Sequence, residues 1–274
     1  MRVVFLGTPE IAVPYLRALH GAGHRIRIVV TGADKRRGRG GGTSPSPVKE
    51  AALALGLPVS HSVDDVLEVD AELGVVVAFG RIIRPNVLAR VPMVNVHFSL
   101  LPRWRGAAPV ERAILAGDEI TGVDVMRVEE GLDTGAVYAR AQVPIGPDDT
   151  AADVRAALVE QGTRLLVEQL AAHSLEWLDH GHPQVGETTY AEKLSSSELE
   201  LDWSRPDVEN HRLVRVGGAW TTFRGKRLKV HAADLRDGRM VPTVVQPEGK
   251  PRMDFDAWRN GARPGPDELF GDLP

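Results

Sequence analysis

The chain has 274 residues, of which 43% are hydrophobic and 26% charged, so it can bury a core and form one large or two modest domains. It contains no cysteine, which excludes disulfides, thiolate nucleophiles and Cys-ligated zinc. The histidines are scattered, and no apolar stretch approaches the ~18 residues of a membrane span. We therefore expect a cytoplasmic protein with no bound metal.

The charge is unevenly distributed along the chain. The net charge is −4, but residues 205–263 hold 13 Lys/Arg and 7 Asp/Glu, an excess of +6 that leaves −10 for the remainder. A basic C-terminal region on an acidic body indicates a polyanionic partner, although a solvated surface would have the same composition.

The first half of the chain alternates predicted strands and helices. Thr8 as N-cap and Pro9 at N1 predict a helix that ends near Gly21. Ser46-Pro47 and Gly56 mark the start and stop of a second helix. Because strands alternate with helices, we expect a Rossmann-like, mostly parallel α/β sheet covered on both faces. The apolar runs that predict its strands are Val3–Leu6, Arg25–Thr31, Gly74–Ala78 and Met93–His97.

The second half begins with the longest predicted helix, which a capping box at residues 150–153 opens and which runs to about Leu178. An extended connector follows, and a short helix then begins at Ser204-Arg205-Pro206. Strands at Trp220–Phe223 and Arg227–Val230 predict a hairpin in a small β-rich domain. We expect a loose tail after residue 263, because that segment is rich in Pro, Gly and acidic residues.

The glycines of the chain do not encode a dinucleotide site. Gly7-Thr8-Pro9-Glu10 has one glycine where the fingerprint needs three, and the glycines of residues 38–42 lie in a loop, so NAD and ATP are excluded. That loop carries Arg36, Arg37 and Arg39. These arginines suit the phosphates and bases of a nucleic acid, although a plain mobile loop would have the same sequence.

Three polar residues form a candidate catalytic set. Asn95 and His97 are two apart in a predicted strand, so they share a face, and the turn closed by Pro102 puts them at the edge of the sheet. Asp133 stands in the glycine-flanked turn 131–135. An Asn amide can donate to a carbonyl oxygen that gains charge, His can accept or return a proton, and Asp can orient the imidazole. The set therefore predicts acyl transfer to an amine that the substrate supplies.

At this point the chain resembles the methionyl-tRNA formyltransferases. The resemblance covers residues 1–203 almost without interruption, and the wider folate-dependent formyltransferases share only the Asn, His, Leu-Pro and Asp elements. The segments that carry it are Val3–Pro9, Pro45–Lys49, Val76–Gly80, Asn95–His97, Ser99–Pro109 and Gly131–Gly135.

The resemblance implies transfer of a formyl group from 10-formyltetrahydrofolate to the amino group of methionine on initiator tRNA. It implies that Asn95, His97 and Asp133 are catalytic and that Arg39 enters the end of the tRNA. It also implies a monomer with a formyltransferase domain at 1–186, a linker at 187–204 and an OB-like domain at 205–274. The residues implied in folate binding, largely through the backbone, are Phe79, Gly80, Ile82, Ser99, Leu100, Leu101 and Pro102.

The sequence departs from the family pattern in three places. Phe98 replaces a small residue or proline, which would narrow the mouth of the pocket, and Gly41-Gly42-Thr43 replaces lysines of the arginine loop. Only about seventy residues follow Ser204, where family members carry an OB-like barrel of about a hundred. A truncated barrel predicts a lower affinity for tRNA.

Two other functions remain open at this stage. An N-formyltransferase for a small amine, such as a nucleotide-linked amino sugar, fits the short second domain but not the retained arginine loop. A non-catalytic paralogue that binds folate or RNA is at odds with the intact Asn95, His97 and Asp133.

Overall fold

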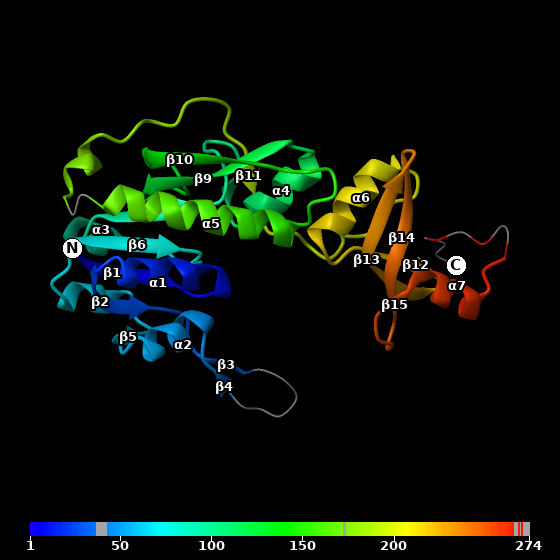
Figure 1. Ribbon diagram of the computed structural model, residues 1–274, viewed down its shortest axis with the longest axis horizontal. Coiled ribbons are helices and arrows are strands. Elements are labelled where there is room, and N and C mark those ends of the chain that lie inside the picture. Colours follow the sequence, from blue (N-terminus) through cyan, green and yellow to red (C-terminus); the bar gives the residue numbers. More distant parts are fainter. Residues whose placement is uncertain (37–42, 172–173, 266–267, 269, 271–274) are drawn as a thin grey trace. The chain divides into compact units, whose positions relative to one another are not determined.

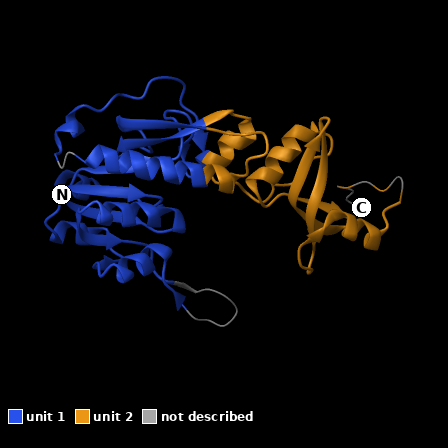
Figure 2. Cartoon of the chain, in the orientation of Figure 1, with its two compact units in different colours: residues 1–109, 121–143, 156–191 blue, residues 110–120, 144–155, 192–274 orange. Residues whose placement is uncertain are grey.

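The computed structural model describes residues 1–36, 43–171, 174–265, 268 and 270. The chain forms two compact units (Figure 2). The first comprises residues 1–109, 121–143 and 156–191, and the second comprises residues 110–120, 144–155 and 192–274. The first five residues of the predicted linker, 187–191, thus lie in the first unit.

The first unit is built on a seven-stranded sheet with the order β10-β9-β7-β6-β1-β2-β5 (Figure 1). The five strands from β7 to β5 are parallel, and β9 is antiparallel to β7. The predicted mostly parallel α/β sheet is confirmed, and the four predicted strands lie within one residue of the observed ones. The strands are β1 Arg2–Gly7, β2 Arg25–Val30, β5 Val59–Ser60, β6 Leu73–Val77, β7 Met93–His97, β9 Ile120–Arg127 and β10 Val137–Pro144.

Short helices and two small ladders complete this unit. The two-stranded pairs are β3 Lys35–Arg36 with β4 Thr43–Ser44, and β8 Arg105–Gly106 with β11 Tyr190–Ala191. The helices of this unit are α1 Val13–Gly21, α2 Pro47–Ala54, α3 Pro85–Arg90 and most of α5 Ala151–Leu170, with 3₁₀ turns at Glu10–Ala12, Asp64–Glu68 and Glu176–Asp179. Helix α4 Pro109–Ala116 belongs, apart from its first residue, to the second unit, as do the first five residues of α5.

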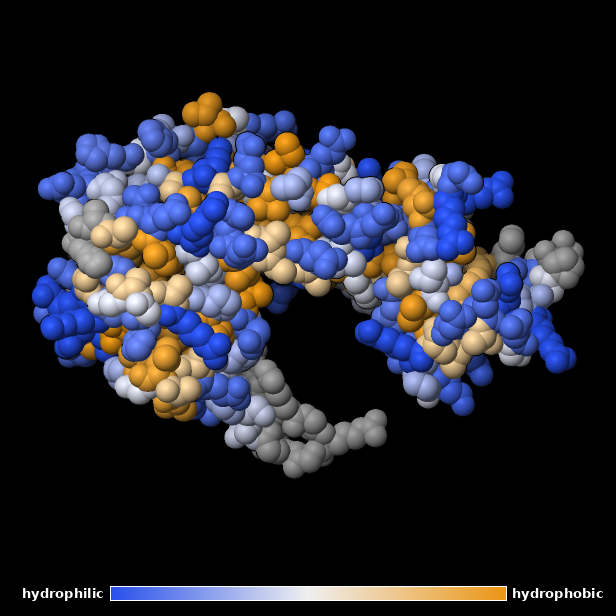
Figure 3. Space-filling view, viewed as in Figure 1, coloured by the Kyte–Doolittle hydropathy of each residue, from blue (hydrophilic) through white to orange (hydrophobic). Residues whose placement is uncertain are grey.

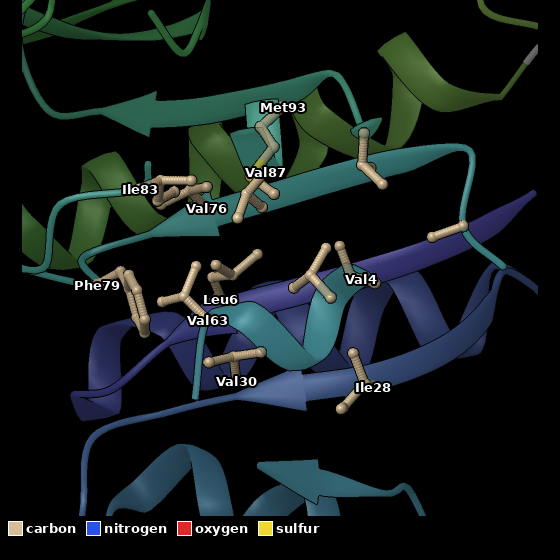
Figure 4. Close-up of a cluster of buried hydrophobic side chains, with 13 residues drawn as sticks. Val4, Leu6, Ile28, Val30, Val63, Val76, Phe79, Ile83, Val87 and Met93 are labelled. Atoms are coloured by element: carbon tan, nitrogen blue, oxygen red, sulfur yellow. The ribbon is translucent and has the colours of Figure 1, made fainter. Parts of the chain in front are cut away.

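One face of the sheet is packed by an apolar cluster that the sequence alternation produces. Val4 and Leu6 of β1 point to the same side, as do Ile28 and Val30 of β2, and all four are buried (Figure 4). They meet Val63, which precedes the second 3₁₀ turn, Val87 of α3 and the ring of Phe79 (Figure 4). Val66, within that turn, belongs to the same cluster. This packing fixes the strand ends on which the candidate site lies.

Two of the predicted helix boundaries are wrong, the start of the first helix and the end of α5. Thr8 does not cap the first helix, because its Oγ1 accepts a hydrogen bond from the Gly32 backbone N–H at 3.1 Å and so joins the ends of β1 and β2. The capping box that opens α5 is confirmed, since Thr150 and Asp153 exchange hydrogen bonds. That helix ends at Leu170 rather than near Leu178, and a separate 3₁₀ turn covers Glu176–Asp179.

The second unit contains a four-stranded antiparallel sheet with the order β12-β13-β14-β15. The predicted helix and hairpin are confirmed as α6 Asp207–Val216 and the pair β12 Trp220–Phe223 and β13 Lys226–Arg236. The long return from β13 into β14 was not predicted. It turns at Asp237-Gly238, where both residues have positive φ. The remaining elements are β14 Arg239–Pro247, β15 Met253–Asp254 and α7 Phe255–Ala262.

The described part of the tail is docked, so the expectation of a loose tail is wrong there. The Phe270 ring stacks on Trp203 with a centroid distance of 5.2 Å, and Glu268 forms hydrogen bonds with Arg224. Hydrophilic residues dominate the face that Figure 3 shows, with hydrophobic residues scattered among them. Within the described ranges, none of the helices combines the length and the apolar character that crossing a bilayer requires.

Acid is expected to weaken the second unit through His211 of α6. This imidazole is buried, and its Nε2 donates to the Ala233 carbonyl oxygen at 3.2 Å. Burial lowers the pKa of His211, and Arg215 adds to this effect, while the hydrogen bond to Ala233 and the charges of Asp148 and Asp234 oppose it. Because the folded state resists protonation, the stabilisation is complete above the unfolded pKa of about 6.5 and is lost as the pH falls through the lower folded value.

The His211→Gln variant should therefore lose less unfolding free energy than the wild type when the pH is lowered. Urea unfolding at about pH 7.5 and about pH 5 measures this difference. Equal losses in the two proteins would show that His211 does not carry the acid sensitivity.

Candidate active site

The candidate site lies at the carboxyl edge of the parallel strands. The pairing register places Leu6 of β1 beside Val76 of β6, and Val76 beside Asn95 of β7, so the three strands end together. The loops that follow them are residues 8–9, 78–84 and 98–104. The sheet order also reverses at β1, with β2 on one side and β6 on the other. Such a reversal is where open α/β sheets bind their ligands.

Asn95 and His97 extend from the end of β7 with different partners. Asn95 is half-buried, and within the described residues its carboxamide has no hydrogen-bond partner. His97 is buried, and its Nε2 lies 3.0 Å from the carbonyl oxygen of Trp104. A carbonyl only accepts, so Nε2 carries a proton and Nδ1 bears the lone pair of the neutral ring. The Nδ1 atom faces the Asp133 Oδ2 at 3.6 Å.

Asp133 is held at the tip of the loop between β9 and β10. Its backbone has a φ of 49°, and its Oδ2 accepts a hydrogen bond from the Gly106 N–H at 2.8 Å. A Cβ on Gly135 would lie 2.1 Å from the Arg127 carbonyl oxygen, so the loop closes this tightly only with glycine there. The structure thus brings His97 and Asp133 together, with Asn95 two residues away on the same strand. A proton on Nδ1 would lie opposite a carboxylate.

The turn after His97 is held by an ion pair between the buried carboxylate of Asp124 and the partly exposed guanidinium of Arg140. The Asp124 Oδ2 accepts from the Leu101 N–H at 2.9 Å, and the Leu101 carbonyl accepts from Arg140 Nη2 at 2.6 Å. Arg140 also donates twice to the fully buried Asp124 carboxylate, which raises the pKa of the guanidinium. Burial raises the pKa of Asp124, and the hydrogen bonds from Arg140 oppose that rise. The pair holds both polar groups of the Leu101 backbone.

Removing the charge at this pair should destabilise the first unit. In Asp124→Asn the amide N–H₂ would face the guanidinium of Arg140, leaving a buried donor without a partner. We expect a loss of about 1–3 kcal/mol of unfolding free energy in urea. Breaking a fully buried pair costs roughly 3–5 kcal/mol, but Arg140 is 42% exposed and can turn to water.

The matched control is Glu168→Gln on α5, which removes a charge from an exposed pair with Arg164 and should cost about 0–0.5 kcal/mol. Equal losses in Asp124→Asn and in this control would contradict the role of the pair.

The residues predicted to bind folate divide into two groups. In the turn 99–102, the Ser99 Oγ donates to the Arg103 carbonyl oxygen at 2.6 Å, and the Leu101 backbone is engaged as described, so these polar groups build the turn. Phe98 is buried. In the loop 79–82, by contrast, no backbone hydrogen bond occurs among the described residues. The Phe79 ring belongs to the core (Figure 4). The side chain of Ile82 is 90% exposed. This loop offers free backbone groups beside an exposed apolar side chain.

The arginine loop is only partly described. Arg36 pairs with Thr43 at the end of the β3–β4 ladder. Arg37 and Arg39 lie outside the described residues, so their roles stay predictions. The ladder is anchored at its base, where Lys49 Nζ contacts the Asp34 carboxylate at 2.8 Å.

Several residues that shape the site were missed in the sequence. Trp104 lies in the motif segment Ser99–Pro109 but acts through its backbone carbonyl, which a side-chain motif does not report, and Gln184 and Thr189 belong to a segment with no recognisable motif. Each contacts the loops around His97 and Asp133. A cavity of about 260 Å³ lies beside these loops, and none of the catalytic candidates lines it. Its lining residues are Leu101, Val137, Tyr138, Ala139, Arg140, His182, Pro183, Gln184 and Val185.

A parallel α/β sheet that gathers an amide, an imidazole and a carboxylate at its carboxyl edge defines a Rossmann-like enzyme domain with an acid–base site. Residues 1–170 match the family described as formyl transferase. A methionyl-tRNA formyltransferase of Heliobacterium modesticaldum is 40% identical over 316 aligned positions, which cover 99% of this chain and 100% of that protein. One from Dinoroseobacter shibae is 45% identical, with 87% and 84% covered. The chain therefore belongs to the formyl transferase family and, within it, to the methionyl-tRNA formyltransferases, as its motifs predicted.

Solved structures agree on the fold. A methionyl-tRNA formyltransferase from Clostridium thermocellum matches with a TM-score of 0.66 at 14% identity, covering 90% of this chain and 98% of that one. HypX from Aquifex aeolicus in complex with tetrahydrofolic acid matches with a TM-score of 0.63 at 17% identity, covering 100% of this chain and 51% of that chain. The family works with folate derivatives.

Proposed function

We propose that this protein transfers a formyl group from 10-formyltetrahydrofolate to the amino group of methionyl initiator tRNA, acting as a monomer in the cytoplasm. The observation that carries the proposal is the Asn95 carboxamide, which has no hydrogen-bond partner among the residues the structure describes, beside the His97–Asp133 contact. The chain that holds this site is 40% identical over its length to a methionyl-tRNA formyltransferase. We assign catalysis to residues 1–186, a connection to residues 187–204 and tRNA binding to residues 205–274.

The loop 79–82 fits a folate derivative. Its backbone N–H and C=O groups are free among the described residues and can pair with the polar edge of a flat heterocycle, while the exposed side chain of Ile82 can cover an apolar face. We assign Phe79, Gly80 and Ile82 to this contact, with Ser99, Leu100, Leu101 and Pro102 shaping the opposite turn. The bound folate derivative supplies the formyl group.

Asn95 and His97 then perform different tasks. The Asn95 amide donates a hydrogen bond to the formyl oxygen as charge builds there, at no cost of breaking an internal bond. His97 takes the proton released by the attacking amine at Nδ1, because Nε2 is already protonated and bound to the Trp104 carbonyl. It then returns that proton to the folate nitrogen as the bond between this nitrogen and the formyl carbon breaks. Asp133 faces that nitrogen and balances the positive charge. An amine with a pKa near ~8 needs no stronger base than an imidazole.

The nucleic-acid partner is supported by charge. The excess of +6 over residues 205–263 and the arginines Arg36, Arg37 and Arg39 suit a polyanion. Phosphate contacts release counterions, so formylation of charged tRNA should fall steeply as salt rises.

The direct test incubates the pure protein with 10-formyltetrahydrofolate and either methionyl initiator tRNA or a nucleotide-linked amino sugar, over a salt series. Formylation of the tRNA with a steep salt dependence is the expected result. Turnover of the amino sugar with none of the tRNA would replace the proposal by the second function. That alternative has a specific basis, because an N-formyltransferase from Helicobacter canadensis in complex with folinic acid and dTDP-3-aminofucose matches the fold with a TM-score of 0.62 at 16% identity.

A further inference from the structure

The side chain of Gln184 makes four hydrogen bonds, all of them around Asp133. Its Nε2 donates to the carbonyl oxygens of Asp133 at 2.8 Å and of Gly135 at 2.9 Å. Its Oε1 accepts from Arg105 Nε at 3.1 Å and from Arg105 Nη2 at 2.6 Å. Both ends of the amide are thus used, and the acceptor end takes the fork of a charged guanidinium, which makes for strong hydrogen bonds.

These contacts close a ring that contains the aspartate. Gly106 follows Arg105 in β8, and the Gly106 N–H donates to the carboxylate of Asp133. Gln184 holds the backbone of Asp133 on one side and Arg105 on the other. One side chain, that of Gln184, therefore fixes the positions of Asp133 and of the strand that carries Gly106 relative to each other. Gln184 lies about fifty residues further along the chain than Asp133.

Thr189, five residues after Gln184, supports the loop on the His97 side of the site. The Thr189 Oγ1 accepts from the Trp104 N–H at 2.9 Å, and the Thr189 carbonyl accepts from the Arg105 N–H at 2.9 Å. Trp104 supplies the carbonyl that holds His97. The segment 184–191 thus supports both partners of the imidazole, the Trp104 carbonyl and the Asp133 carboxylate.

Asp133 needs such support because its own backbone does not hold it. Its φ of 49° lies in the left-handed region, which costs free energy for any residue with a Cβ. The loop keeps this conformation only while its carbonyl groups have partners, and Gln184 supplies N–H donors to two of them. Losing these donors frees the loop to rotate the carboxylate away from His97.

We infer that Gln184 is a positioning residue, which acts on formyl transfer by holding Asp133 against His97 and makes no contact with the substrates itself. The kinetic part of this inference rests on the proposed function, because it measures formylation. The placement of Asp133 by Gln184 can be measured without any substrate.

The test uses Gln184→Met, which keeps the length and volume of the side chain and removes its hydrogen bonds, with Gln184→Ala as a second variant. The control is Gln161→Met on α5, where a glutamine also accepts from an arginine, Arg164, but has no contact with the loop 131–135 among the described residues. Thermal melts establish that each variant is folded.

The first readout is hydrogen exchange at the amide of Gly106, which reports the hydrogen bond to Asp133 directly. We expect this amide to exchange faster in Gln184→Met, on the order of tenfold, and to be unchanged in Gln161→Met. Unchanged protection of Gly106 in both Gln184 variants would overturn the inference, whatever the enzyme catalyses.

The second readout is a double-mutant cycle on formylation. Gln184→Met should lower kcat by about 10–100-fold with little change in KM, and the same change made in an Asp133→Asn background should cost less than about twofold. An equal loss in both backgrounds would overturn the inference, because it would mean that Gln184 acts through another part of the molecule. A wild-type protein that exchanges Gly106 slowly but forms no formyl-methionyl-tRNA would contradict the proposed function alone.

Discussion

Replacing Asn95 with alanine is expected to lower kcat for formylation of methionyl initiator tRNA by about 10²–10³-fold. The carboxamide has no hydrogen-bond partner among the described residues, so it is free to bind the developing oxyanion. A donor that strengthens its bond only in the transition state changes kcat rather than KM. Steady-state kinetics with both substrates varied measures this split.

The control for this variant is Asn86→Ala on α3, which removes an exposed carboxamide from the surface. It should retain the kcat of the wild type. A loss of less than about tenfold in Asn95→Ala would mean that another group stabilises the oxyanion.

The strands of the first unit could be read directly from the sequence. Runs such as Val3–Leu6 and Gly74–Ala78 are continuous in apolar or small residues, as parallel strands buried on both faces require, and a glycine follows closely after each. Helix starts were harder to predict, because a hydroxyl can bond to more than one partner. Ser46 caps its helix through the Lys49 N–H, whereas Thr8 bonds to a neighbouring strand end that is distant in sequence.

The spacing of Asn95 and His97 sufficed to place both on one strand end, and the contact between His97 and Asp133 agrees with the family resemblance. Neither the spacing nor the resemblance told which ring nitrogen of His97 carries the proton. It depends on the Trp104 carbonyl, which no side-chain pattern reports, and on a turn held by Asp124 and Arg140. In the sequence, Asp124 and Arg140 look like charged residues on the exposed face of a strand, so nothing indicates that they pair with each other. Long-range hydrogen bonds of this kind appear only once the chain is folded.

The sequence predicted fewer strands in the second unit than the structure contains, for a related reason. Its longest hairpin, β13 with β14, contains Ala232, Ala233 and Asp234, which break the apolar alternation expected of a strand. Pairing across the two strands compensates for the weak pattern, and register shifts near Ala232 accommodate it. Half-buried sheets depend on such pairing more than on the character of single strands.

Replacing His97 with alanine is expected to lower kcat by about 10²–10⁴-fold, the usual value of a positioned general acid or base. The imidazole is the group that can accept a proton at Nδ1 while its other nitrogen stays bound to the Trp104 carbonyl. Asp133→Asn should be less damaging, because the imidazole keeps its position and loses only the facing negative charge. The same initiator tRNA assay measures both variants, with His180→Ala as a control at an exposed histidine.

Added imidazole separates a proton-transfer role of His97 from a packing role. The ring is buried, so its removal leaves a cavity of imidazole shape bounded by the Trp104 carbonyl and the Asp133 carboxylate. Free imidazole that enters this cavity should restore part of the lost rate in His97→Ala, and it should restore nothing in Asn95→Ala, where the base is still present. Recovery of His97→Ala by the apolar analogue cyclopentane to the same extent would mean that the ring serves only to fill space. If His97 transfers a proton, only a compound with a basic nitrogen restores the rate of His97→Ala, because only that atom can take the proton from the attacking amine.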